Sequence, residues 1–216
     1  LAAVHQLLRG GELTENRRQR DHVERAALAA WRTGERSAAV AAWAATGRVH
    51  AGDQVDDVHD AMTTAWAGAR QAWTDPHDRI GHLLLLAHTN ADVDALNTRA
   101  RAAARAAGDL ADIDYTWAVH EGRAAGTRMH LAIGDQVMTL TNDHDLGVLN
   151  GERGIVTAVD VPARRARITR RETGPDGPVR VDTWLPAAYI AAGGLTHAYA
   201  ITAAKAQGLT ADRALV

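Results

Sequence analysis

The sequence contains no cysteine. This absence excludes disulfide bonds, zinc sites built on thiolates and catalysis by a thiol. It fits a reducing compartment, so we expect the protein to be cytoplasmic. Phenylalanine is missing too, and the aromatic residues are three tyrosines and six tryptophans in a chain that is very rich in alanine.

Lysine is nearly absent as well. Lys205 is the only lysine, and every other member of the Lys+Arg count of 24 is an arginine. Abundant arginine and alanine are what GC-rich codons produce, so we interpret this bias as genomic. The same bias tends to replace lysine by arginine, which makes the retention of Lys205 a feature to explain.

The chain also lacks long apolar runs and a strong net charge. No run approaches the roughly 20 residues that span a bilayer, so no membrane partner is expected. The formal net charge is −2, so no global field draws the chain to nucleic acid, and any such contact must come from a local patch. A chain of 216 residues can bury one good core with a second small module.

Several catalytic motifs are missing. There is no HExxH, GxSxG or GxGxxG, and a P-loop is excluded because the single lysine is followed by Ala206 instead of Ser or Thr. The 11 histidines lack the spacing of metal ligands, so no metal site is predicted. Alone, the chain has no obvious way of holding ATP and Mg²⁺.

The first half of the chain is alanine-rich and helical in period. From Val23 the apolar residues repeat at helical spacing, and Gly34 is expected to end this helix. Asp53 is expected to cap a second helix, which Asp75-Pro76 would end. Tryptophans at helical spacing indicate packing between helices rather than base stacking.

A strand–loop–helix pattern follows. Leu83 to Ala87 form a short, fully apolar run, and His88 to Asn90 form a loop before a periodic helix. A continuous apolar run bounded by turns is typical of a buried parallel strand. Residues 198–208 repeat the arrangement as a strand and a short helical start. The two units predict an α/β fold.

Between these units lies a region of β character. Residues 134–140 are expected to form a strand, and Asn150-Gly151 indicates a type I′ turn. Residues 165–171 and 179–185 flank a turn-rich hairpin tip. Several short strands with tight turns suggest a small barrel, so we expect a β module inserted into the α/β domain.

Arg17 and Arg18 form the first candidate site, at the expected start of a helix. On composition alone, such a pair is mostly a solvated helix face. A planar guanidinium at a domain edge can also reach a γ-phosphate held by a neighbouring domain and stabilise the charge that develops during phosphoryl transfer.

Two more candidate sites follow the apolar strands. Thr89 and Asn90 lie where ligands of open α/β sheets bind, although either residue is also a good helix N-cap. The second group lies at the equivalent position after the later strand and comprises Thr202, Lys205, Gln207 and Gly208. Hydroxyl, ammonium and backbone amide groups position the phosphates of a nucleic-acid backbone.

A local basic patch falls within the β region. Arg165, Arg167 and Arg171 share one face of the expected strand because side chains alternate along it. They fit contacts to DNA phosphates. They fit equally well the solvated side of a hairpin, and the sequence does not favour either.

Taken in order, these motifs resemble the second RecA-like domain of superfamily 1 helicases of the RecD-like branch. The resemblance is to the helicase part of conjugative relaxase-helicases of the TraI/TrwC type. The matching motifs, in chain order, are LTENRRQ, AHTNADVDALN, GDQVMTLTNDHDLGVLNGERGIVTAVD and HAYAITAAKAQGLT. They cover nearly the whole chain, and their order carries the resemblance because each motif alone is weak.

The resemblance implies a fold and a domain layout. It implies a RecA-like parallel-sheet domain in two parts, residues 1–130 with a helical N-terminal region and residues 193–216 with the return strand. An SH3-like barrel, residues 131–192, would be inserted between them.

The resemblance also implies residue roles. Arg18 matches the arginine that reaches the γ-phosphate of ATP held between two RecA-like domains. Thr202 matches a contact to the DNA backbone, and the loop that meets both DNA and nucleotide contains Gln207, Gly208 and Thr210. The family pattern T-x-H-K has Ala204 at the histidine position here, a departure at a residue that normally approaches DNA.

Two functions follow from the resemblance. In the first, the chain is the second motor domain of an ATP-dependent 5′–3′ DNA helicase, with single-stranded DNA and an upstream P-loop domain as partners and a relaxase domain as a further one. ATP and Mg²⁺ would be held mainly upstream, and the chain alone would be inactive. We expect it to be a piece of a longer protein, since it begins without Met and ends in an apolar run. In the second, it is a vestigial module that binds single-stranded DNA or a partner protein without hydrolysing ATP.

Overall fold

The computed structural model describes Gln19 and residues 21–216. The chain divides into two compact units, Leu1–Asp53 and Gln54–Val216, and each is described by itself. The candidate arginines Arg17 and Arg18 lie outside the described residues. None of the helices in the described part combines the length and apolar composition needed to cross a membrane.

The first unit contains two helices, α2 (His22–Thr33) and α3 (Arg36–Ala45). The Asp21 side chain accepts a hydrogen bond from the Val23 N–H and caps the start of α2. Gly34 ends α2 with φ 94°, a left-handed conformation that glycine adopts at low cost. The predicted helix and its stop are therefore confirmed.

The second unit opens with α4 (Val55–Ala69) and a short 3₁₀ turn, η1 (Arg70–Ala72). Two predictions are wrong here. The N-cap is Gln54 instead of Asp53, because Gln54 and Asp57 form a reciprocal capping box. Asp75-Pro76 begins the next helix instead of ending this one, since Asp75 caps the His77 N–H and proline fits the first helical turn.

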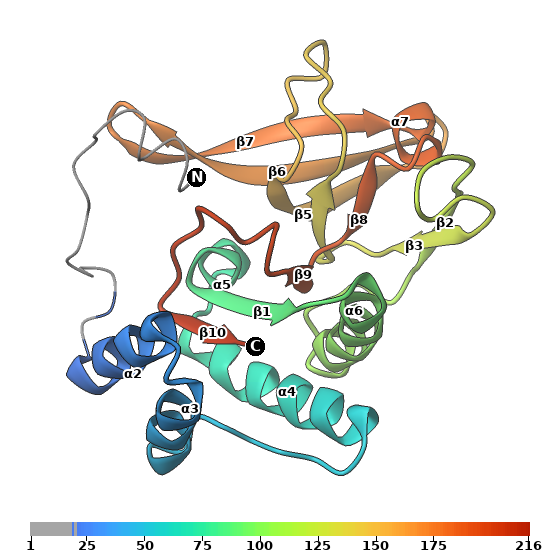
Figure 1. Cartoon of the computed structure of the whole chain (residues 1–216). Helices are drawn as coiled ribbons and strands as arrows, with labels where there is room; N and C mark the ends of the chain where they lie inside the picture. The colour runs from blue at the N-terminus through green and yellow to red at the C-terminus, as the bar shows by residue number, and fades with distance from the viewer. Residues whose placement is uncertain (1–18, 20) are drawn as a thin grey trace, which may run out of the picture. The chain divides into compact units, whose positions relative to one another are not determined.

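A three-stranded parallel sheet forms the centre of this unit. Helix α5 (Pro76–His82) leads directly into β1 (Leu83–Ala87), and α6 (Asn90–Ala106) follows that strand. Strand β1 lies between β10 (Arg213–Leu215) and β9 (Ala200–Thr202), and both neighbours run parallel to it. The predicted buried parallel strand is confirmed (Figure 1).

Strand β1 is apolar throughout because both of its faces are covered. On the face toward α4 and α6, Leu85 belongs to a buried cluster with Trp66 and Leu96. On the other face, Leu84 packs in a cluster with Met138 and Ile201. Trp66 is also in edge-on contact with the Tyr199 ring, so its predicted packing role is confirmed.

The remaining elements follow α6 in the sequence. They are β2 (Tyr115–Ala118), β3 (Arg128–Leu131), β4 (Gln136–Thr139), β5 (Arg153–Asp160), β6 (Arg165–Gly174), β7 (Gly177–Pro186), α7 (Ala187–Ala191) and β8 (Leu195–His197). Strands β2 and β3 form a separate antiparallel ribbon. The larger antiparallel sheet has the order β7-β6-β5-β4-β8.

The predicted hairpin is confirmed, with β6 and β7 in register from Arg165↔Pro186 to Gly174↔Gly177. The type I′ turn is wrong. That turn needs positive φ at both central residues, and only Gly151 has it, at 92°.

A second hydrophobic core lies under this β region. This core includes Leu131 of β3, Ile168 of β6 and Ile190 of α7, and all three side chains are fully buried. Val119 and Leu195 belong to the same cluster, so the core includes residues on both sides of the predicted 131–192 boundaries. Closure of the sheet into an SH3-like barrel stays a prediction.

Candidate nucleic-acid and nucleotide-binding edge

The two predicted motif loops lie side by side at the carboxyl edge of the parallel sheet. Ala87, the last residue of β1, is in register with Thr202, the last residue of β9. The Ala203 N–H donates to the Ala87 carbonyl at 3.0 Å, which joins the two strand ends. Because parallel strands end at one edge, the loops that follow β1 and β9 open on the same side.

The loop after β1 serves first as a helix cap. The Thr89 hydroxyl oxygen accepts from the Asp92 N–H at 3.1 Å and donates to the Asp92 carboxylate at 2.5 Å. That carboxylate lies 3.3 Å from the buried His59 imidazole and has a lowered pKa, chiefly because of the Thr89 hydroxyl. Asn90 is exposed, and its side chain has no partner among the described residues. Of these two candidates, Asn90 therefore has the freer side chain.

The loop after β9 is a series of turns, so the predicted helical start at 203–208 is wrong. The Thr202 hydroxyl accepts from the Lys205 N–H at 3.2 Å, and the Thr202 carbonyl accepts from the Ala206 N–H at 3.1 Å. Gly208 has φ 93°, which turns the chain away before a helix can extend. Lys205, Gln207, Gly208 and Thr210 are exposed.

Lys205 forms no ion pair with any described residue. Partial desolvation, and then the positive charge of Arg123, lower the pKa of its ammonium group. Arg123 lies in the β2–β3 connection, where its guanidinium makes a bidentate pair with Asp94 of α6 at 2.6 and 2.7 Å. Lys205 and Arg123, which come from loops far apart in sequence, are thus close together at this edge. Arg123 has a carboxylate partner, and Lys205 has none among the described residues.

Sequence reasoning missed Asn97, which fixes β9 in place. The buried Asn97 side chain accepts from the Ala200 N–H at 2.9 Å and donates to the Ala200 and His197 carbonyls, both at 3.3 Å. It satisfies backbone groups that no neighbouring strand reaches. The motif ALN contains this residue, but a lone asparagine in a helix carries no signal for such a role.

Sequence reasoning also missed a buried ionic centre at Asp135. Arg101 of α6 contacts both oxygens of this carboxylate, at 2.8 and 2.9 Å, and the Tyr199 hydroxyl donates to it at 2.7 Å. Burial alone would raise the pKa of Asp135, but nearby His197 and Arg101 outweigh it and hold the pKa below its ordinary value. Asp135 thereby connects α6, the entry to β4 and the segment before β9.

The three arginines of the predicted patch are each paired with an acid. Arg165 contacts Asp160 at 3.1 Å and lies 4.4 Å from the Trp184 ring centre. Arg167 lies 3.4 Å from Asp182 and 5.6 Å from the same ring.

Arg171 lies farther along β6 and contacts Asp78 at 2.6 Å. It is therefore joined to α5, whereas Arg165 and Arg167 flank an indole. Within the described residues, no group of three or more His, Asp or Glu side chains is arranged to hold a metal ion.

Comparison with solved structures gives the fold class. The chain is similar to the Pif1 helicase from Bacteroides, crystallised with ADP-AlF3 and single-stranded DNA, with a TM-score of 0.50 and 20% sequence identity. The match covers 94% of this chain and 44% of that one. The parallel sheet with its helices is therefore similar in fold to the RecA-like domain of that helicase, which agrees with the α/β fold predicted from the sequence.

Comparison with curated proteins gives the sequence relatives. The chain is 34% identical over 146 residues to the probable conjugal transfer protein TraA of Sinorhizobium fredii (strain NBRC 101917 / NGR234). It is 32% identical over 144 residues to conjugal transfer protein TraA of Rhizobium radiobacter. Each match covers 67% of this chain and 12% of the relative's length. No protein-family model matches the chain. Its sequence homologues are thus conjugal transfer proteins.

Proposed function

We propose that the chain is the second motor domain of an ATP-dependent 5′–3′ DNA helicase of the conjugative relaxase-helicase type. The observation that carries this proposal is the shared edge, where the loops after β1 and β9 lie together in a helicase fold. An upstream P-loop domain, a relaxase domain and a cytoplasmic location belong to the same proposal.

The chemistry of the edge suits a DNA phosphate. The Lys205 ammonium lacks a carboxylate partner, and the exposed Ala204 N–H has no hydrogen-bond acceptor among the described residues. A phosphate oxygen would accept from both and would offset the positive charge of Arg123. The Thr202 hydroxyl holds the loop in the shape that presents these groups.

Two secondary contacts belong to the DNA proposal. Asn90, with a free amide at the same edge, is a second backbone contact, and Thr89 orients it as the helix cap. Arg165 and Arg167 flank the Trp184 indole, an arrangement of cations and an aromatic ring that suits single-stranded nucleic acid.

The nucleotide would lie between this domain and its P-loop neighbour. The exposed turn that ends at Gly208 offers the Gln207 amide and the Thr210 hydroxyl, which are groups that bind a nucleotide's polar edges. Arg18 would reach the γ-phosphate and stabilise the charge that develops in the transition state. ATP, bound with Mg²⁺ mainly by the upstream domain, supplies the free energy that closes and reopens the two domains on DNA.

A salt titration of single-stranded DNA binding tests the edge. Lys205→Ala is expected to weaken binding by about tenfold and to reduce the slope of log K against log salt by about 1, because one phosphate contact is lost. Arg213→Ala is the control, since Arg213 is an exposed cation at the opposite edge of the same sheet. Equal effects of both substitutions would contradict a phosphate site at Lys205.

Ala204 favours a second candidate, the vestigial module. This residue replaces a histidine of the motif that the chain resembles, at a position that approaches DNA. In the longer protein, Arg18→Ala separates the candidates: an active motor loses nearly all ATP turnover while still binding ATP. Wild-type protein that binds single-stranded DNA but turns over no ATP would establish the module instead.

A further inference from the structure

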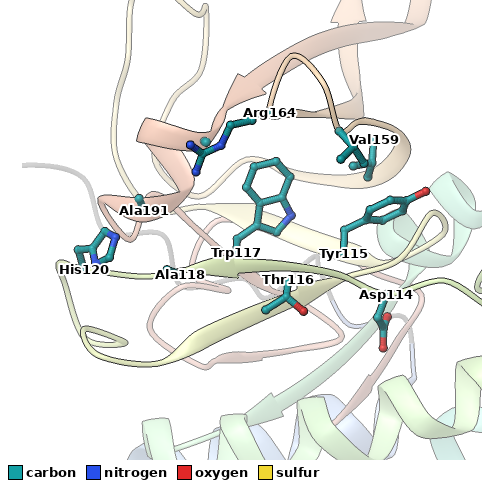
Figure 2. A pocket seen from close by; sticks show the side chains of 11 residues that line it. Asp114, Tyr115, Thr116, Trp117, Ala118, His120, Val159, Arg164 and Ala191 are labelled. Carbon is teal, nitrogen blue, oxygen red and sulfur yellow. The ribbon is translucent and has the colours of Figure 1, made fainter.

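A cavity of about 350 Å³ lies between the β2–β3 ribbon, the turn that joins β5 to β6, and α7. Figure 2 shows Tyr115 and Trp117 rising from one face of β2 toward the turn that carries Arg164, whereas Thr116 points to the other side. Val159 and Ala191 line the remaining walls. The volume lies at the lower end of the range for small-ligand sites, and it suits one planar ring system.

The floor of this cavity is aromatic and firmly held. Trp117 packs against the second hydrophobic core, and β2 is paired with β3 along its whole length. The indole N–H of Trp117 is enclosed and has no acceptor among the described residues. In Figure 2 this nitrogen lies on the side of the ring that faces Tyr115. Because this nitrogen is enclosed, Trp117 offers a ligand only the part of its ring surface that lines the cavity.

Arg164 contributes a cation in an unusual backbone conformation. It is the one described non-glycine residue with positive φ, at 48°. Two hydrogen bonds fix the turn: the Arg164 N–H donates to the Val161 carbonyl at 3.1 Å, and the Ala187 N–H donates to the Arg164 carbonyl at 2.8 Å. A non-glycine residue is held at positive φ only where the surrounding contacts compensate for the backbone strain, and such residues are often found at functional sites.

The guanidinium of Arg164 is free to meet a ligand. Its neighbour Arg165 pairs with Asp160, and Arg167 lies near Asp182. Arg164 itself has no carboxylate partner within the described residues, and its side chain is exposed. The cavity therefore combines two aromatic rings and an unpaired cation.

We propose that this cavity binds a nucleobase of single-stranded DNA, which stacks on Tyr115 and Trp117 while Arg164 contacts the adjoining phosphate. Aromatic stacking together with a nearby cation is how proteins hold single strands without sequence preference. The inference rests on the proposed function. The cavity is a second contact point for DNA, outside the sheet edge. The β2–β3 connection, which carries Arg123, joins the cavity to that edge.

The test compares two labelled single strands of about 12 nucleotides, an oligothymidylate and a strand with the same sugar-phosphate backbone that is abasic at every position. Both present the same phosphates, so their difference reports the bases. The whole chain is expected to bind the normal strand at least about tenfold more tightly, in line with base stacking on aromatic rings.

Three variants locate the base contact. Tyr115→Ala should remove most of the difference between the two strands. Arg164→Asn should weaken both about equally, because asparagine tolerates positive φ and leaves the turn intact. Trp117→Phe keeps a ring against the core and should reduce the preference only in part. Arg128→Asn, which removes an exposed charge from the same ribbon, should leave binding unchanged.

The outcomes separate this inference from the proposed function. Wild-type chain that binds neither strand at low salt would overturn the proposed function. Wild-type chain that binds the normal strand, with a base preference that Tyr115→Ala leaves intact, would overturn the cavity proposal alone. Loss of the preference in Tyr115→Ala, with circular dichroism unchanged, supports it.

Discussion

At the scale of single residues, Asp135 has the most demanding environment in the described part of the chain. Its carboxylate is fully buried, and a buried charge is tolerated only when other groups replace the lost water. Arg101 and Tyr199 supply those contacts from the side chains, and the Ala132 N–H donates from the backbone at 2.6 Å. Arg101 also pairs with Asp114 at 2.5 Å, so loss of the Asp135 charge would reduce the compensation of Arg101 without abolishing it.

Asp135→Asn is therefore expected to lower the free energy of unfolding by about 2 kcal/mol, because it weakens the charge-assisted hydrogen bonds from Arg101, which keeps Asp114 as its other carboxylate partner at 2.5 Å. Urea denaturation followed by circular dichroism measures this. Asp112→Asn is the matched control, since the Asp112 side chain is exposed and makes no ion pair within the described residues. A loss no larger than that of the control would show that Asp135 contributes no net stability.

The comparison of wild type with Asp135→Asn also leads to a prediction about the pH dependence of stability. Because folding lowers the pKa of Asp135, the stability that it contributes is fully present above its unfolded pKa of about 4. That contribution is lost as pH falls through the lower, folded pKa. The difference in unfolding free energy between wild type and Asp135→Asn should stay constant above about pH 5 and shrink below about pH 4. A constant difference down to pH 3 would mean that Asp135 is not the titrating group.

At the scale of elements, short-range chemistry explains what could be predicted. The apolar run of β1, the periodicity of α2 with its glycine stop, and the turn residues between β6 and β7 are local signals, and all three elements form. The errors were also local. Gln54 and Asp57 make a reciprocal cap that outcompetes Asp53, and one negative φ at Asn150 changes the turn type.

Local sequence patterns do not predict contacts between segments that lie far apart in the sequence. Nothing near Asn97 indicates that its amide binds β9 about a hundred residues later. The same holds for Gly134, which has φ 101° and where an added Cβ would lie 2.1 Å from the Asp109 carbonyl oxygen. The edge of the sheet was predicted from Thr89 and Thr202, whereas Arg123 joins it only through tertiary packing.

At the scale of the whole second unit, β9 connects the β region with the proposed DNA edge. The segment that enters this strand carries Tyr199, whose hydroxyl is tied to Asp135 at the start of β4. The strand ends at Thr202, which shapes the loop that presents Lys205. A shift of the β region relative to α6 would therefore also move Lys205 and the rest of the proposed DNA edge.

Tyr199→Phe tests this connection because it removes one hydroxyl and keeps the ring against Trp66. In the longer helicase proposed above, we expect ATP turnover without DNA to stay unchanged and its proposed stimulation by single-stranded DNA to fall several-fold. The reason is that the β region no longer holds the segment that leads to Thr202. The measurement is steady-state turnover at saturating ATP across a DNA titration.

Tyr189→Phe is the matched control for this change. Its hydroxyl donates to the Thr141 carbonyl at 2.7 Å, the same distance as the Tyr199 bond, and Tyr189 packs in the second hydrophobic core. Tyr189→Phe should cost about 1 kcal/mol of stability, and Tyr199→Phe about 2 kcal/mol, because the Tyr199 hydroxyl donates to a charged carboxylate. If both variants lower DNA stimulation equally, the effect is one of stability. If Tyr199→Phe alone lowers it, β9 transmits the position of the β region to the DNA edge.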